Sequence, residues 1–146
     1  MNLGTDDQIV DKIFQLSQIE KSVINHQLKD VGLNPIQARA LNYIAQHPNT
    51  MQKTVSEHLG KLGATTTNIM KVLQQDGLIT RTRPQSNERQ KLLSLTPAGE
   101  ATAEAVRQIF VEMENRIRVG LPEAEQTQLM ALLDKVQARL TDTPNA

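Results

Sequence analysis

The stretch LITRTRPQSNERQKLLSLT, from Leu78 to Thr96, decides the fold. Two short segments rich in apolar and β-branched residues flank a polar tip, which carries Arg83, Glu88, Arg89 and Lys91. Flanks of this kind are typical of paired strands, and such a tip is typical of an exposed loop. The pattern therefore predicts a β-hairpin that holds out a finger with arginines on it.

The segment before the hairpin predicts two helices joined by a tight turn. A short helix ends near Gly60, a turn through Gly63 follows, and a second helix closes at Gly77. A short helix, a glycine turn and a second helix form the helix-turn-helix pattern, which many other helical hairpins share. Because a hairpin follows directly, the combination indicates a winged helix. The second helix is expected to turn three residues inward, namely Thr66, Ile69 and Leu73.

Long helices are predicted before this segment. Apolar residues recur at helical spacing from about residue 6 to residue 30, which predicts one long amphipathic helix that Gly32 ends. The next helix has the clearest start in the chain. Asn34 is suited to its N-cap, Pro35 to its first position and Gln37 to the reciprocal capping bond.

Two more helices are predicted after the hairpin. Thr96 is expected to cap a helix that has Pro97 at its first position and runs to about Val119. The last helix is expected to have Pro122 at its first position. Its apolar stripe comprises Leu129, Leu132, Leu133, Val136 and Leu140.

The predicted fold is mainly α-helical, with a small β-hairpin wing. We expect one domain over residues 1–141, with a winged lobe at about 34–96, long helices at about 6–30 and 97–140, and a tail at 142–146. The terminal helices are longer than a small winged helix can cover, so a second copy of the chain is the natural cover. An intramolecular bundle is the alternative.

Composition excludes several classes of protein. The chain has 146 residues, and only 2% of them are aromatic, which argues against a single-strand binder built on stacking platforms. It has no cysteine, which excludes disulfides, thiolate metal sites and thiol catalysis. The N-terminus lacks the pattern of a signal peptide, and no apolar stretch approaches the length of a membrane span. We expect a cytoplasmic protein.

The net charge is zero, but basic residues gather in one region. From Lys53 to Lys91 there are seven basic residues and three acidic ones, so this segment carries +4. Chance clustering on a solvated face is common. The cluster gains weight here because the same segment has the architecture of a nucleic-acid-binding motif.

Several polar side chains are expected to face outward from the second helix of the pair. Hydroxyls near its start suit bonds to phosphates and base edges, Asn68 can pair with adenine, and Lys71 can meet a phosphate or guanine. Helix capping is the alternative reading of the threonine run. Arg89 is suited to a narrow minor groove. The candidate DNA contacts are Thr65, Thr66, Thr67, Asn68, Lys71, Arg81, Arg83, Arg89 and Lys91.

No catalytic or metal-binding pattern is recognised. His26, His47 and His58 lack ligand-like spacing, and Glu57 with His58 is the only adjacent pair of possible ligands. There is no glycine-rich phosphate loop, nucleophile elbow or catalytic dyad. We therefore expect neither an enzyme nor a bound metal or cofactor. A winged helix that binds another protein rather than DNA is the alternative function.

Four segments resemble the MarR family of bacterial transcription regulators: LNPIQARALNYIAQHP (33–48), QKTVSEHLG (52–60), TTTNIMKVLQQDGLITR (65–81) and LLSLTPAG (92–99). The resemblance implies a homodimer whose recognition helices enter successive major grooves of double-stranded DNA while each wing reaches a minor groove. It also implies repression that a small ligand relieves. The ligand pocket would lie among the first, second and fifth helices, with its residues unassigned.

Two positions depart from the family pattern. The wing usually carries Asp, any residue and then Arg, whereas this chain has Asn87, Glu88 and Arg89. In the recognition helix, Thr67 matches the usual threonine, but Asn68 replaces the following arginine. The resemblance therefore implies a DNA-binding surface that is less cationic than is typical.

Overall fold

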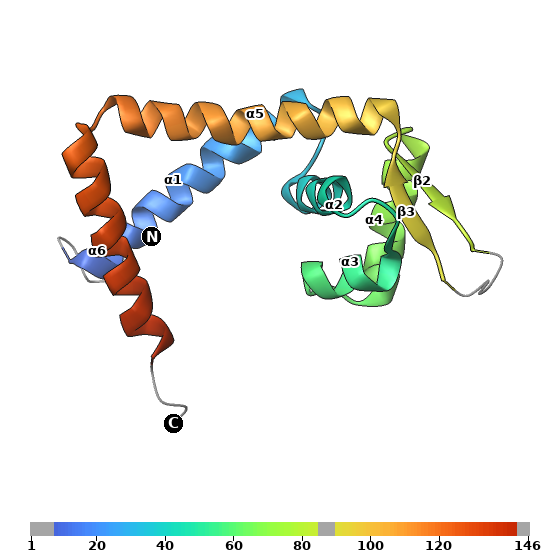
Figure 1. Ribbon diagram of the computed structural model, residues 1–146, viewed down its shortest axis with the longest axis horizontal. Coiled ribbons are helices and arrows are strands. Elements are labelled where there is room, and N and C mark those ends of the chain that lie inside the picture. Colours follow the sequence, from blue (N-terminus) through green and yellow to red (C-terminus); the bar gives the residue numbers. More distant parts are fainter. Residues whose placement is uncertain (1–7, 85–89, 143–146) are drawn as a thin grey trace. The chain divides into compact units, whose positions relative to one another are not determined.

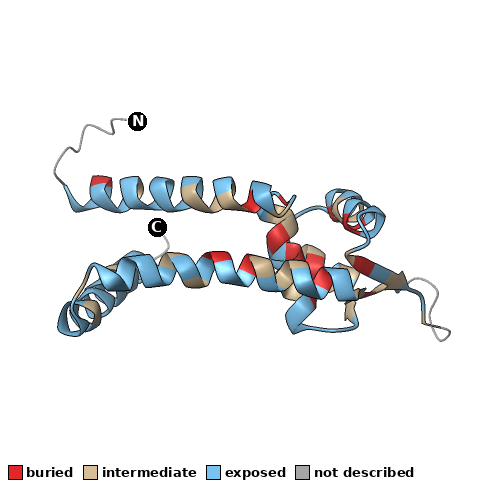
Figure 2. Ribbon diagram, turned by 90° about the horizontal axis from the view of Figure 1, so that it is seen from above, coloured by how far each residue is buried: buried red, intermediate tan, exposed pale blue. Residues whose placement is uncertain are grey.

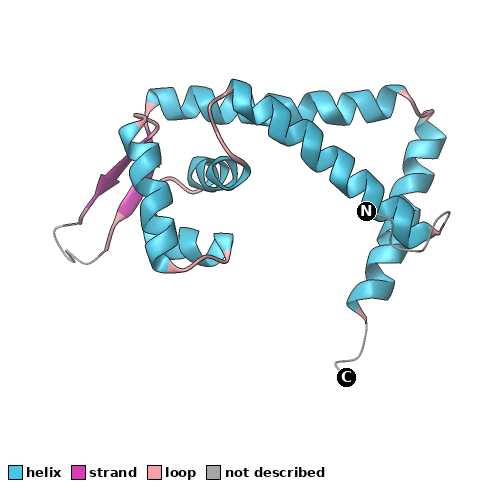
Figure 3. Cartoon of the chain, turned by 180° about the vertical axis from the view of Figure 1, so that it is seen from behind, coloured by secondary structure: helices cyan, strands magenta, loops and turns pink. Residues whose placement is uncertain are grey.

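The computed structural model describes residues 8–84 and 90–142. The chain divides into two compact units, Met1–Ile109 and Phe110–Ala146. The described residues are mostly helical, with one small antiparallel sheet (Figures 1 and 3). The fold class expected from the sequence is confirmed. No helix among the described residues is long and apolar enough to cross a membrane.

The first unit contains the winged helix. Its elements are α1 (Ile9–Asp30), α2 (Pro35–Gln46), β1 (Thr50–Met51), α3 (Gln52–Leu59), α4 (Gly63–Gln75), β2 (Ile79–Thr82), β3 (Leu92–Leu95) and the part of α5 (Pro97–Val119) up to Ile109.

The core of this unit is aliphatic. Every helix of the unit and strands β2 and β3 contribute to it, which fixes the helix pair against the sheet (Figure 2). The largest fully buried apolar side chains are Leu28, Leu41, Ile44, Val55, Met70, Leu73, Ile79 and Leu93.

The start of α2 forms as predicted. The backbone N–H of Gln37 donates to Asn34 Oδ1 at 2.9 Å, and the backbone N–H of Asn34 donates to Gln37 Oε1 at 3.0 Å. Pro35 occupies the first turn, where its missing N–H costs nothing. These bonds satisfy donors that the first helical turn leaves without partners.

The helix pair α3–α4 differs slightly from the prediction. Gly60 ends α3 with a φ of 64°, a left-handed conformation that glycine adopts at little cost. Gly63 is the first residue of α4 rather than part of the turn. Thr66 and Leu73 are fully buried and Ile69 is half-buried against the core, as predicted, whereas the fully buried Met70 was not predicted. A helix turns about 100° per residue, so neighbouring apolar positions compete for one buried face.

The wing is a three-stranded antiparallel sheet with the order β1-β3-β2. Arg81 and Thr50 both pair with Leu93, so the central strand has a neighbour on each side. The hairpin strands were predicted from the sequence, whereas β1 was not. Residues 85–89 at the tip lie outside the described residues.

The start of helix α5 contacts the turn between α4 and β2. Thr96 Oγ1 accepts from the backbone N–H of Gly99 at 3.0 Å, which confirms the predicted cap, and it donates to the carbonyl of Gly77. The backbone N–H of Thr96 donates to the carbonyl of Leu78 at 3.0 Å. A Cβ on Gly99 would lie 1.9 Å from that Leu78 oxygen, so this contact requires glycine.

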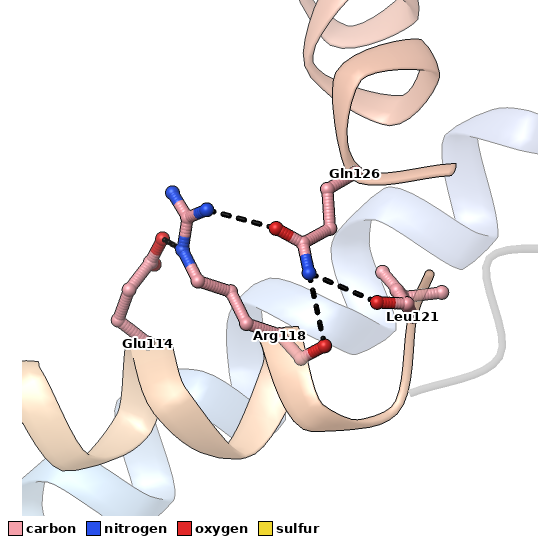
Figure 4. A network of polar contacts seen from close by, with 4 residues as sticks. All are labelled: Glu114, Arg118, Leu121 and Gln126. Carbon is pink, nitrogen blue, oxygen red and sulfur yellow. Dashed lines mark hydrogen bonds and ion pairs between the residues drawn. The ribbon is translucent and has the colours of Figure 1, made fainter. Parts of the chain in front are cut away.

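The second unit contains the end of α5 and helix α6 (Glu123–Thr141). Arg118 donates to Glu114 at 2.6 Å and to Gln126 at 2.8 Å, and Gln126 in turn donates to the carbonyls of Arg118 and Leu121 (Figure 4). The prediction that Pro122 is the first helical residue is wrong by one position. Its ψ of 153° is extended, so Pro122 stands at the N-cap.

Candidate nucleic-acid interface

Helix α4 presents part of the predicted surface. Thr65, Asn68 and Lys71 are exposed, and Thr67 is half-buried. Thr66 is 0% exposed, and its Oγ1 donates to Ser56 Oγ at 2.9 Å. Its inclusion among the DNA contacts is therefore wrong, because its hydroxyl serves the packing of α4 on α3.

The hydroxyl of Thr67 already has two partners within the protein. It donates to the carbonyl of Gly63 at 2.9 Å and accepts from Gln52 Nε2 at 2.9 Å. A hydroxyl has one donor and two acceptor positions, so these bonds leave a single acceptor position. Thr67 can thus accept from a base amino group without rearrangement, but it cannot donate to a phosphate.

The side chain of Gln52 connects this helix to the wing. Its Oε1 accepts from the Nη2 of Arg81 at 3.0 Å, and Arg81 lies on β2. Gln52 was not among the sequence candidates. Its partners lie 15 and 29 residues further along the chain, so no local pattern could have identified it.

Four of the predicted basic residues converge beside α4. The pKa of Lys91 lies below its usual value of 10.5, because of repulsion from Arg81, partial desolvation, and repulsion from Arg83 and Lys71. Repulsion of this kind acts between cations that lie close together. They line a concavity of about 420 Å³ together with Thr67, Gln74 and Thr82.

That concavity has no acidic side chain among its described lining residues. Cations that repel one another and have no carboxylate beside them attract an external polyanion. A second concavity of about 750 Å³ shares Thr67 and Lys91 with the first and runs along α3 and the start of α4. Lys53 and Lys61 also line it, as does one acidic residue, Glu57.

The wing tip lies outside the described residues. Arg89, the residue assigned to the minor groove, and its neighbours Asn87 and Glu88 all belong to it. Strands β2 and β3 lead directly into this segment, and Arg83 and Lys91 lie close to its two ends. The assignment of Arg89 stays a prediction.

In the described part of the chain, no three His, Asp or Glu side chains are placed to hold a metal ion. His47 and His58 instead stack on the ring of Tyr43, with centroid distances of 4.2 and 4.4 Å.

A helix pair, a hairpin wing and cations that converge beside the second helix together define a winged helix-turn-helix protein. Comparison with family models shows what this part of the chain is similar to. The MarR family model matches residues 31–90, which confirms the resemblance seen in the sequence.

Relatives of the chain are regulators. It is 31% identical over 94 residues to the HTH-type transcriptional regulator BilQ of Clostridium symbiosum, a match that covers 64% of this chain and 65% of that protein. The chain thus spans about two thirds of that relative's length.

The fold matches solved regulators over nearly the whole chain. MepR, a transcription regulator of the Staphylococcus aureus multidrug efflux pump MepA, is 27% identical, with a TM-score of 0.84 over 91% of this chain and 98% of MepR. The MepR chain in the crystal structure of the S. aureus MepR–DNA complex is 26% identical, with a TM-score of 0.72 over 92% of this chain and 99% of that chain.

Proposed function

We propose that this protein is a transcription regulator that binds double-stranded DNA sequence-specifically as a homodimer. The observation that carries the proposal is the convergence of Lys71, Arg81, Arg83 and Lys91 on one side of α4, beside exposed Thr65 and Asn68. Phosphate contacts from the cations would position the protein, and polar groups of α4 would read base edges. The solved DNA complex of MepR supports this use of the fold.

The assembly rests on apolar surface that one copy leaves exposed. On α1, Ile9, Leu16 and Ile19 are 72%, 57% and 60% exposed. On α6 no residue is buried, and Leu132 and Leu133 are 50% and 45% exposed. Monomeric proteins seldom leave such stripes in water, whereas a two-fold dimer covers the same patch on both copies. The target would then be an inverted repeat.

Regulation by a small organic ligand is part of the proposal. The chain has no cysteine, so oxidation of a thiol cannot release it from DNA. We place the regulator in the cytoplasm, where bacterial DNA lies, and assign it the role of a repressor that the ligand releases.

Fluorescence anisotropy tests the proposal. The probes are a duplex with the inverted repeat found beside the gene and a scrambled duplex, each titrated at several salt concentrations. We expect tighter binding to the repeat, and each cation removed should reduce the salt dependence by about one phosphate contact per protomer. Lys71→Ala is the variant, and Arg39→Ala, at an exposed position of α2 outside both concavities, is the control.

Two results would contradict the proposal. If neither duplex binds at low salt, the winged helix serves another purpose, such as binding a protein. If sedimentation at micromolar concentration gives a 16.3 kDa monomer, the proposed dimer is wrong.

A further inference from the structure

Gln52 contacts three elements of the winged helix at once. It is the first residue of α3. Its side-chain amide donates to Thr67 of α4 at 2.9 Å and accepts from Arg81 of β2 at 3.0 Å. Its backbone N–H donates to the carbonyl of Lys91, directly before β3, at 2.9 Å.

We propose that Gln52 is a positioning residue that joins the DNA-reading helix α4 to the wing, so that both bind DNA as one unit. This inference rests on the proposed function. Thr67 and Arg81 need no direct contact to influence each other, because the same amide group holds both.

The chemistry of the linkage requires an amide. The nitrogen of a glutamine side chain donates and its oxygen accepts, so one residue can satisfy a hydroxyl oxygen and a guanidinium together. A glutamate can accept from Arg81 but cannot donate to Thr67. A methionine has a similar length and replaces neither bond.

The linkage also affects the cost of binding. An arginine side chain loses rotamer freedom when it docks on DNA, and a side chain that is already held loses less. Gln52 holds the Arg81 guanidinium beside α4 before DNA arrives. The bonds of the Thr67 hydroxyl to Gln52 and Gly63 fix its orientation, so that its remaining acceptor position is available for a base amino group.

A mutant cycle in DNA affinity tests the linkage. Thr67→Val and Arg81→Ala are measured singly and together, first with Gln52 present and then in Gln52→Met. With Gln52 present, the combined loss of affinity should be about 3- to 10-fold smaller than the product of the single losses, since each change already disturbs the shared amide. In Gln52→Met the losses should multiply.

Further variants separate positioning from general damage to the fold. Gln74, on α4, lines the concavity of about 420 Å³ together with Thr67 and Arg81 but has no bond to either among the described contacts, so Gln74→Met should leave the coupling intact. Gln52→Glu, which retains the acceptor for Arg81, should remove the coupling as Gln52→Met does. Far-ultraviolet circular dichroism at each step checks that the variants are folded.

The outcomes distinguish the inference from the function on which it rests. If the unmodified protein binds no duplex at low salt, the proposed function fails and the linkage with it. If the protein binds, and Thr67 and Arg81 stay coupled to the same degree in both Gln52 variants, Gln52 is not the link and only this inference is overturned.

Discussion

Replacing Gly99 by alanine should loosen the junction between the wing and α5. The added Cβ would lie 1.9 Å from the carbonyl oxygen of Leu78 and 2.9 Å from its carbon, and both are backbone atoms that cannot rotate away. Overpacking of this kind costs about 1–3 kcal/mol. The bond from Thr96 N–H to the same oxygen would also weaken, which costs about 1 kcal/mol.

Alanine regains part of this loss, because it favours a helix over glycine by up to about 1 kcal/mol. The net result should be a decrease in the free energy of unfolding of about 1–3 kcal/mol. Urea unfolding at a fixed protein concentration measures it.

Gly63 provides the matched control. It also lies in the first turn of a helix, but a Cβ there meets no atom within 4 Å, and its φ is not left-handed. Gly63→Ala should therefore leave stability unchanged or raise it by up to about 1 kcal/mol. If Gly99→Ala and Gly63→Ala unfold at the same urea concentration, the reasoning from the close approach is refuted.

Three other changes test the described contacts. Asn34→Ala removes the side-chain half of a capping box and should cost about 1 kcal/mol of stability in urea unfolding; an unchanged midpoint would contradict the role of the cap. Gln126→Ala breaks the bonds that tie the start of α6 to the end of α5, so helical signal near 222 nm should be lost at lower temperature than in Gln137→Ala. Arg81→Gln removes the largest repulsion on Lys91, whose pKa should rise toward 10.5 in an NMR titration, and a constant pKa would show that desolvation dominates.

The fold was predictable where short-range chemistry determines it. Asn34 and Gln37 satisfy each other across three residues, and Thr96 caps its helix in the same local way. The hairpin was visible because β-branched and apolar residues flank its polar tip. Strand β1 was not visible, since two residues carry no periodicity and Thr50 becomes a strand only by pairing with Leu93.

The sequence predicted most residues of the candidate site but not the hydrogen bonds that join them. The sequence identified Lys71, Arg81 and Lys91 as basic residues of one segment, and the fold brings them beside α4. It could not show that Thr66 faces the core, because a threonine suits a cap, a surface and a buried hydrogen bond equally well. Nor could it identify Gln52, whose partners are set by tertiary packing.

The stacked ring of Tyr43 has a practical consequence for spectroscopy. The chain has one tyrosine and no tryptophan, so emission excited at about 280 nm, where phenylalanine does not absorb, comes from Tyr43 at the junction of α2 and α3. Melting confined to residues 110–146 would leave that emission unchanged, although circular dichroism would record it. If emission and circular dichroism change at the same temperature, the two units unfold cooperatively. If they change at different temperatures, each unit has its own stability, which can be measured without an added label.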